Sequence, residues 1–184
     1  MKLSLAIAQT LKAHGIGHVF VVSGGASLHL IHGIADTEGI EYVCTQHEQA
    51  GGFAADSYAR FTGIGCALAT SGPGATNLIT AIATSYYDSV PVLYLTGQTA
   101  TFRLDNKGTR QIGFQATPIV PMVSGITKYA VTPLKAEDVI PAIERAIDEA
   151  RGGRPGPVLV DICDDLQRAE VTLPEKVRDL RTCY

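Results

Sequence analysis

The sequence predicts a single α/β domain whose six-stranded, mostly parallel sheet carries helices on both faces. Short apolar runs alternate along the chain with longer segments in which apolar residues recur at helical spacing. Uninterrupted apolar runs are typical of strands buried on both faces of a parallel sheet, and the helical segments between them supply the crossovers. With 184 residues, 46% of them hydrophobic, the chain is long enough to bury a substantial core.

Six apolar runs are the expected strands, at residues 18–23, 41–44, 65–70, 91–96, 128–132 and 157–162. Several of them end in glycine or small polar residues, at 23–25, 70–74 and 96–98. Because the carboxyl ends of parallel strands meet at one edge of a sheet, these loops are expected to line one rim. Backbone can approach a ligand closely where side chains are absent, which favours a small-molecule site there.

Helices are expected at residues 3–14, 26–35, 48–60, 77–87, 118–123 and 136–150. The last is the clearest, because Val139, Ile143 and Ile147 fall on one face. Residues 99–113 are polar and lack a clear period, which indicates a surface loop. We expect the domain to cover residues 1–165, and the charged stretch 166–184 to be a linker towards a middle domain.

Charge and composition argue against several classes of protein. The net charge is −3 and no basic block is present, so nucleic acid is not expected as a partner. No apolar run approaches the roughly 18 residues of a membrane span. The cysteines, Cys44, Cys66, Cys163 and Cys183, are far apart and have no metal-ligand spacing. We expect no metal site in this chain, reduced thiols and a cytoplasmic protein without a signal peptide.

Glu48 is the first candidate for chemistry. It follows the apolar run 41–44 and begins a helix whose next turns are rich in alanine and glycine. Small neighbours allow that helix to lie close to the rest of the domain, so the carboxylate would be partly removed from water. A carboxyl group in such surroundings can hold or pass a proton near neutral pH. The alternative is a surface glutamate that interacts favourably with the helix dipole.

The loop at residues 71–77 allows two interpretations. Its glycines free backbone amides in front of a helix, as in phosphate sites, but the Lys-Ser/Thr ending of a P-loop and the dinucleotide glycine spacing are both missing. Pro73 also removes an amide donor. A loop that packs against a flat ring fits better, and a simple strand-to-helix turn is the other reading.

The histidines do not form a recognisable site. His47 and Glu48 are adjacent, so their side chains diverge on a helix, and no third ligand lies at zinc spacing. His29 and His32 share a helix face, where surface or core roles are expected.

Several short segments together resemble a known family. They are Gly24-Gly25-Ala26, His47-Glu48-Gln49, Tyr58-Ala59-Arg60 with Thr62-Gly63, residues 70–77, Asp88-Ser89-Val90-Pro91, Thr96-Gly97-Gln98 and Phe114-Gln115. Their order and spacing resemble the N-terminal, pyrimidine-binding domain of thiamine diphosphate-dependent enzymes, closest to the acetolactate synthase group. The resemblance extends over residues 3–165 and is more specific for the domain than for the substrate.

The resemblance implies a role for individual residues. Glu48 would hydrogen-bond a ring nitrogen of the aminopyrimidine, and protonation there promotes removal of the thiazolium proton. Pro73 and Asn77 would border the pyrimidine. Gln115 and the backbone of Gly24 and Gly25 would face the thiazolium or the substrate. Phe114 and Lys128 are weaker candidates beside the substrate channel.

Three positions depart from the family pattern. Ser23 stands where proline is usual before the two glycines, Val22 where an aromatic residue is common, and Ala116 where an acid commonly follows Phe-Gln. All three are expected on the substrate side of the site. They leave the Glu48 segment intact but argue against a standard acetolactate synthase.

The resemblance also predicts what lies outside this chain. Enzymes of this kind hold the diphosphate through Mg²⁺ in a separate domain marked by Gly-Asp-Gly, which does not occur here. The chain is therefore expected to be a part of a transferase or lyase acting on a 2-oxo acid such as pyruvate, inactive alone, with FAD allowed in the full enzyme. Its partners would be a second copy of the chain and a diphosphate-binding domain. The alternatives are the α subunit of a two-chain 2-oxo acid decarboxylase and a non-catalytic nucleotide-binding or interaction domain.

Overall fold

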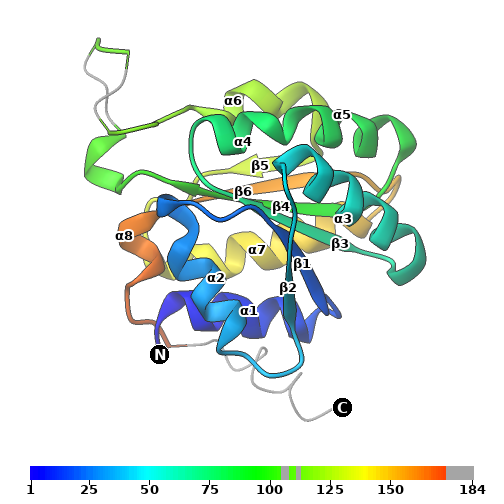
Figure 1. Ribbon diagram of the computed structural model, residues 1–184, viewed down its shortest axis with the longest axis horizontal. Coiled ribbons are helices and arrows are strands. Elements are labelled where there is room, and N and C mark those ends of the chain that lie inside the picture. Colours follow the sequence, from blue (N-terminus) through cyan, green and yellow to red (C-terminus); the bar gives the residue numbers. More distant parts are fainter. Residues whose placement is uncertain (105–107, 111–112, 173–184) are drawn as a thin grey trace.

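A six-stranded, all-parallel sheet lies at the centre of the computed structural model, which describes residues 1–104, 108–110 and 113–172 (Figure 1). The strand order is β2-β1-β3-β4-β6-β5. The strands are β1 (His18–Val21), β2 (Glu41–Cys44), β3 (Gly65–Ala69), β4 (Val92–Gln98), β5 (Tyr129–Val131) and β6 (Val158–Cys163). Every pairing is parallel, so the α/β class predicted from the sequence is confirmed.

Helices connect the strands and cover both faces of the sheet (Figure 1). The α-helices are α1 (Leu3–Ala13), α2 (Leu28–Ala35), α3 (Glu48–Thr62), α4 (Pro73–Asn77), α5 (Ile79–Asp88), α6 (Ile119–Val123), α7 (Ala136–Arg151) and α8 (Asp164–Gln167). Short 3-10 turns are η1 (Gly25–Ser27), η2 (Thr101–Arg103) and η3 (Ser124–Ile126).

The two faces of the sheet bury different kinds of side chain. On one face, α1, α2 and α7 bury leucine and isoleucine, for example Leu3, Ile7, Ile34 and Ile143. On the other face, α3 to α6 pack through a core in which alanine is prominent, at positions 55, 59, 67, 69, 75 and 81. Small side chains let helices and strands approach closely, and this second face carries the helix that begins with Glu48.

How deeply each strand is buried follows from its position in the sheet. β3, β4 and β6 are buried along their whole length, as their continuous apolar runs predict. β2 is exposed at every residue because it forms one edge of the sheet. β5 forms the other edge and is half-buried.

Some boundaries differ from those expected. β4 continues to Gln98, since Gly97 and Gln98 still pair with β6. The helix expected from about residue 77 to 87 is α5, and the segment before it, expected to be a loop, contains the short helix α4, which ends at Asn77. The domain boundary expected at residue 165 falls inside α8, and Leu166 and Val171 pack against the core. The rest of the expected linker, 173–184, lies outside the described residues.

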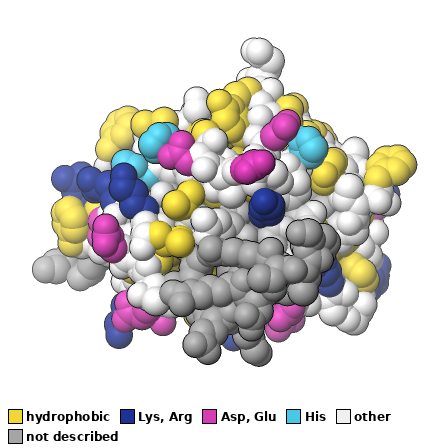
Figure 2. All heavy atoms as spheres, turned by 90° about the horizontal axis from the view of Figure 1, so that it is seen from below, with side chains coloured by type: hydrophobic (Ala, Val, Ile, Leu, Met, Phe, Trp, Pro, Cys, Tyr) yellow, Lys and Arg dark blue, Asp and Glu magenta, His cyan; other side chains and the backbone are white. Residues whose placement is uncertain are grey.

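The surface near α1 carries both signs of charge. Figure 2 shows this face with acidic, basic and histidine side chains interspersed rather than gathered by sign. Among the described helices, none combines the length and apolar character needed to cross a bilayer.

Gly65 offers a test of how tightly α3 packs on the sheet. A Cβ atom at this position would lie 2.0 Å from the carbonyl oxygen of Ala55, which belongs to the α3 backbone and cannot move alone. We expect Gly65→Ala to lower the free energy of unfolding by about 1–3 kcal/mol, measured by urea denaturation. Gly125→Ala is the control, since a Cβ there meets nothing within 4 Å. Equal stability of the two variants would contradict this packing.

Candidate functional site

The segment before α3 fixes the position of Glu48. The backbone amide of Thr45 donates to Val21 at 2.9 Å, which keeps the chain beside β1 after β2 has ended. His47 caps α3, because its Nδ1 accepts a hydrogen bond from the Gln49 amide at 3.1 Å. Glu48 is therefore the first helical residue, at the carboxyl edge of the sheet, and its side chain is half-buried.

Asn77 holds the Glu48 carboxylate in place. Its Nδ2 donates to Oε2 of Glu48 at 2.9 Å, which joins the start of α3 to the end of α4. The other oxygen, Oε1, lies 3.3 Å from where a Cβ of Gly74 would be, and no donor within the described residues hydrogen-bonds to it. One carboxylate oxygen is thus committed to the protein, and the other lies beside a glycine.

The small residues behind Glu48 let α3 sit close to its neighbours, as the sequence predicts. A Cβ at Gly52 would lie 2.5 Å from the Cβ of Ala81 in α5 and 3.4 Å from the ring of Tyr94 in β4. A buried polar network reinforces this contact: Asp56 accepts a hydrogen bond from Ser85 at 2.8 Å, and Ser85 also bonds the Tyr94 hydroxyl at 2.9 Å. These contacts fix the middle of α3 against α5 and β4.

Thr70, directly after β3, is the point where the glycine loops meet. Its Cγ2 lies 2.4 Å from where a Cβ of Gly24 would be and 2.8 Å from that of Gly74. Its hydroxyl accepts a hydrogen bond from the Ala26 amide at 3.2 Å. The loops after β1 and β3 flank the point where the chain reverses its direction of sheet growth, and open α/β sheets bind ligands at such points.

Gln115 reaches the same rim from the loop before α6. A Cβ at Gly72 would lie 2.7 Å from the Cβ of Gln115, and both residues have positive φ angles, 63° for Gly72 and 55° for Gln115. The neighbouring Phe114 is 80% exposed. Pro73, the first residue of α4, is also exposed on this rim. The structure therefore brings Gly24, Gly25, Glu48, Pro73, Asn77 and Gln115 to one edge of the sheet.

Lys128 is not brought to this rim. It precedes β5, so it lies at the amino edge of a sheet whose carboxyl edge carries Glu48. Its Nζ donates to the carbonyl oxygens of Glu149 and Gly152, where α7 ends. A cation there satisfies orphan carbonyls and favours the helix dipole, so Lys128 stabilises α7 in this chain.

The remaining candidates from the sequence lie away from Glu48. His29 is 3.7 Å from Asp164, and His32 is 3.7 Å from Asp36 on the same helix. Within the described ranges, no group of three or more His, Cys, Asp or Glu side chains is placed to share a metal ion. A cavity of about 540 Å³ lies between the ends of α1 and α2, near Lys12, Gly17 and Gly39. It is at the amino edge, where parallel strands do not gather ligand-binding loops.

Asp161 in β6 anchors the loop that carries Gln115. This aspartate is 2% exposed and accepts hydrogen bonds from Thr96 at 2.6 Å, Gln98 at 2.9 Å and Thr132 at 3.2 Å. Gln98 Nε2 also donates to the Thr117 carbonyl at 2.8 Å, so the carboxylate fixes the amide that holds the loop. Burial raises the pKa of Asp161 to about 6, while its three hydrogen bonds act in the opposite direction.

Comparison with known proteins agrees with this geometry. Residues 1–118 match the family described as thiamine pyrophosphate enzyme, N-terminal TPP binding domain. The chain belongs to this family. TPP is thiamine diphosphate, the cofactor that the resemblance implies, and the matched residues include every rim residue named above.

Similar proteins are acetolactate synthases from distant organisms. The chain is 39% identical over 184 residues to acetolactate synthase 2, chloroplastic, of Nicotiana tabacum, which covers 98% of this chain and 26% of that protein. It is 41% identical over 160 residues to the acetolactate synthase large subunit of Haemophilus influenzae, covering 86% of this chain and 27% of the relative. This TPP binding domain thus spans about a quarter of the length of the curated relatives it matches.

Sequence reasoning did not identify two residues that support the rim. Asp161 could have been identified from the sequence, because it is a lone charged residue inside the apolar run of β6. Gln167 could not, since it lies in a polar stretch of the sequence, yet its side chain is fully buried and donates a hydrogen bond to the Ala26 carbonyl at 2.7 Å.

The raised pKa of Asp161 predicts how stability depends on pH. Between the ordinary aspartate pKa of 3.8 and the folded value of about 6, the folded chain holds a proton that the unfolded chain has lost. The free energy of unfolding of the wild type, relative to Asp161→Asn, should therefore fall by about 2 kcal/mol as pH rises from 4 to 7. Urea denaturation of both proteins across this range measures the difference. A difference that stays constant or grows with pH would contradict the assignment.

Proposed function

We propose that this chain forms the aminopyrimidine-binding half of a thiamine diphosphate site in an acetolactate synthase-like enzyme, which decarboxylates and joins 2-oxo acids such as pyruvate. The observation that carries the proposal is the half-buried Glu48 carboxylate, held by Asn77 on a rim of glycine loops. Membership of the thiamine pyrophosphate enzyme family and the acetolactate synthase relatives support the same activity.

The rim has the shape and chemistry that a flat heterocycle requires. A Cβ at Gly25 would meet nothing within 4 Å, so the backbone there faces open space and can approach a ligand. Gly74 leaves Oε1 of Glu48 uncovered by a side chain. Pro73 offers an apolar ring on the same loop and no competing amide donor. These residues fit a planar, partly apolar ring that exchanges one hydrogen bond with a carboxyl group.

Glu48 would hold and transfer a proton at a ring nitrogen of the aminopyrimidine. When bound, thiamine diphosphate supplies the nucleophilic carbon that attacks the 2-oxo acid. Asn77 orients the carboxyl group by donating a hydrogen bond to Oε2, which would leave Oε1 to face the ring. The capped start of α3 and the close packing of Gly52 on Ala81 fix the helix on which Glu48 lies, so the carboxyl group stays aligned.

The rest of the site would come from another domain. The sequence has no Gly-Asp-Gly segment for a Mg²⁺-held diphosphate, so a diphosphate-binding domain of the same or another chain would anchor the cofactor. The chain alone would then bind the cofactor weakly and be inactive, because the pyrimidine end provides only part of the contacts.

A second copy of the chain would pack against α3 and α5. The outer side of α3 exposes Ala50, Phe53 and Ser57, and Phe61 at its end is 91% exposed. Tyr87 of α5 is 72% exposed. Exposed aromatic residues beside small ones are typical of helix surfaces that meet another chain, and this surface adjoins Glu48.

Glu48→Gln tests the catalytic assignment. In the complete enzyme, the amide keeps the shape of Glu48 but cannot exchange a proton with the ring, so the rate of thiazolium proton exchange should fall at least about 100-fold. Hydrogen–deuterium exchange of the bound cofactor, followed by NMR, measures this rate. Glu41→Gln is the matched control, since Glu41 is an exposed carboxylate on β2. Exchange at the wild-type rate in Glu48→Gln would overturn the proposal.

Ser57→Arg tests the proposed contact with a second copy. A long, charged side chain on the outer side of α3 should weaken self-association at least about tenfold without destabilising the fold, because Ser57 is exposed. Sedimentation velocity over a concentration series measures the association. Ala35→Arg places the same side chain at an exposed position of α2, on the other face of the sheet, and should associate as the wild type does. Equal association of all three proteins would contradict this interface.

A further inference from the structure

The short helix α8 packs against the turn that carries Gly24 and Gly25. α8 follows β6 directly, and the Gln167 side chain at its end is fully buried. Nε2 of this side chain donates to two carbonyl groups, that of Ala26 at 2.7 Å and that of Ile162 at 2.9 Å. A single amide thus joins η1 to the last strand of the sheet.

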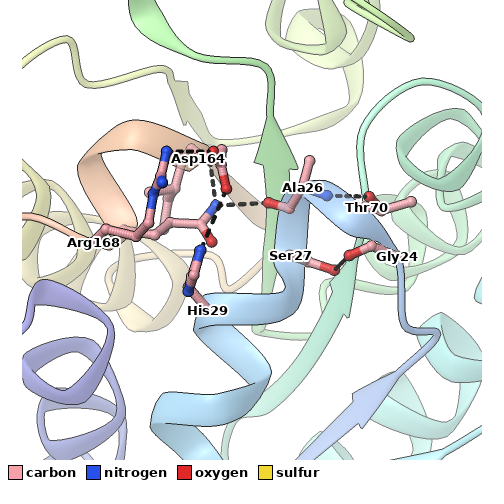
Figure 3. A network of polar contacts seen from close by, with 9 residues as sticks. Gly24, Ala26, Ser27, His29, Thr70, Asp164 and Arg168 are labelled. Carbon is pink, nitrogen blue, oxygen red and sulfur yellow. Dashed lines mark hydrogen bonds and ion pairs between the residues drawn. The ribbon is translucent and has the colours of Figure 1, made fainter.

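The Ala26 carbonyl has no freedom to move away from this amide. A Cβ at Gly97 would lie 2.0 Å from its oxygen, so β4 supports the carbonyl from below while Gln167 donates to it. The Ala26 amide donates in turn to the Thr70 hydroxyl at 3.2 Å (Figure 3). Both backbone polar groups of Ala26 are therefore fixed by side chains from other parts of the chain.

Internal hydrogen bonds complete the turn. The amide and hydroxyl of Ser27 donate to the Gly24 carbonyl at 3.0 and 3.1 Å. Within the turn, Gly25 has no neighbour within 4 Å of its would-be Cβ. The contacts with β3, β4 and α8 thus hold the turn from behind and leave Gly25 facing outward.

The ion pairs of α8 are more exposed, and the hydrogen bonds that Asp165 accepts from Thr101 join α8 to η2 rather than to the turn. Asp164 accepts a hydrogen bond from Arg168 at 3.0 Å and lies 3.7 Å from His29 (Figure 3). Exposed ion pairs of this kind contribute little to stability. Gln167, by contrast, is buried, and its Oε1 has no hydrogen-bond partner among the residues that the structure describes. The donor side of its amide is therefore what connects it to the turn.

We propose that Gln167 is a positioning residue, which holds the Gly24–Gly25 turn in the conformation that receives thiamine diphosphate. This inference rests on the proposed function, because it takes the turn to face the cofactor. Without the Gln167 donor, the Ala26 carbonyl would lose its fixed partner, and binding would have to order the turn first. The affinity for the cofactor should then fall, while the chemistry at Glu48 should not change.

Gln167→Met tests the proposal in the complete enzyme, since methionine fills a similar volume without donors. The cofactor concentration for half-maximal activity should rise about tenfold, with kcat at saturating cofactor within about twofold of the wild type. In the 184-residue chain alone, amide hydrogen exchange at Ala26 and Ser27 should also be faster. Arg168→Gln is the matched control, because Arg168 lies next to Gln167 but contacts Asp164 instead, and it should change neither reading.

Gln167→Asn tests the same role of Gln167 if the Gln167→Met variant does not fold. It keeps an amide at the site but is one methylene too short to hold both carbonyls, so the same two shifts are expected. Wild-type half-saturation in a folded Gln167 variant, or a loss of kcat without a change in half-saturation, would overturn the proposal. Glu48→Gln in the same preparation separates the two hypotheses: if it remains fully active, the proposed function fails, and if it loses activity while the Gln167 variants match the wild type, only the role of Gln167 fails.

Discussion

The hydrogen bond from Asn77 to Glu48 is the contact on which the rim depends. It joins two helices that follow different strands, α3 and α4, and it gives a carboxylate at a helix start a fixed direction. That bond can form only because α3 lies close to α4 and α5. Gly52 against Ala81, and Gly74 against Glu48, leave room for this approach, and a larger side chain at either glycine would force the elements apart.

Because all strands are parallel, the sheet has a carboxyl edge and an amino edge, and the two have different roles. The carboxyl edge gathers glycine turns around Thr70, together with Glu48 and the loop of Gln115. The amino edge holds stabilising contacts, such as that of Lys128 with the end of α7. Two buried polar side chains, Asp161 of β6 and Gln167 of α8, help to hold the loops of the rim against the sheet through hydrogen bonds. The supporting residues are thus set back from the surface that would meet a ligand.

The sequence was sufficient for the class of fold and for much of the rim, and the reasons are physical. Buried parallel strands require continuous apolar runs, so β3 and β6 could be located within a residue or so of their ends. Glu48 could be found because it lies shortly after the end of an apolar run and precedes small residues. The exposure of β2 could not be predicted, since it depends on which strand is at the edge of the sheet. The break at Leu78 leaves no glycine or charge to mark it.

The places of Lys128 and Gln167 depend on contacts that are distant in sequence. Lys128 bonds carbonyls of the 149–152 turn, and Gln167 bonds a carbonyl more than a hundred positions earlier in the chain. Neither pairing has a local pattern, because a single side-chain hydrogen bond constrains only one residue at each end. Asp161 is intermediate: its charge inside an apolar run indicates that it has partners without saying which ones.

A crystal structure of the complete enzyme with thiamine diphosphate bound would show directly whether Glu48 meets the cofactor. We expect a ring nitrogen of the aminopyrimidine to lie within hydrogen-bond distance of Glu48 Oε1, with Oε2 still bonded to Asn77 and the ring beside Gly25 and Pro73. An aminopyrimidine bound elsewhere, with the Glu48 carboxylate facing only solvent, would contradict it.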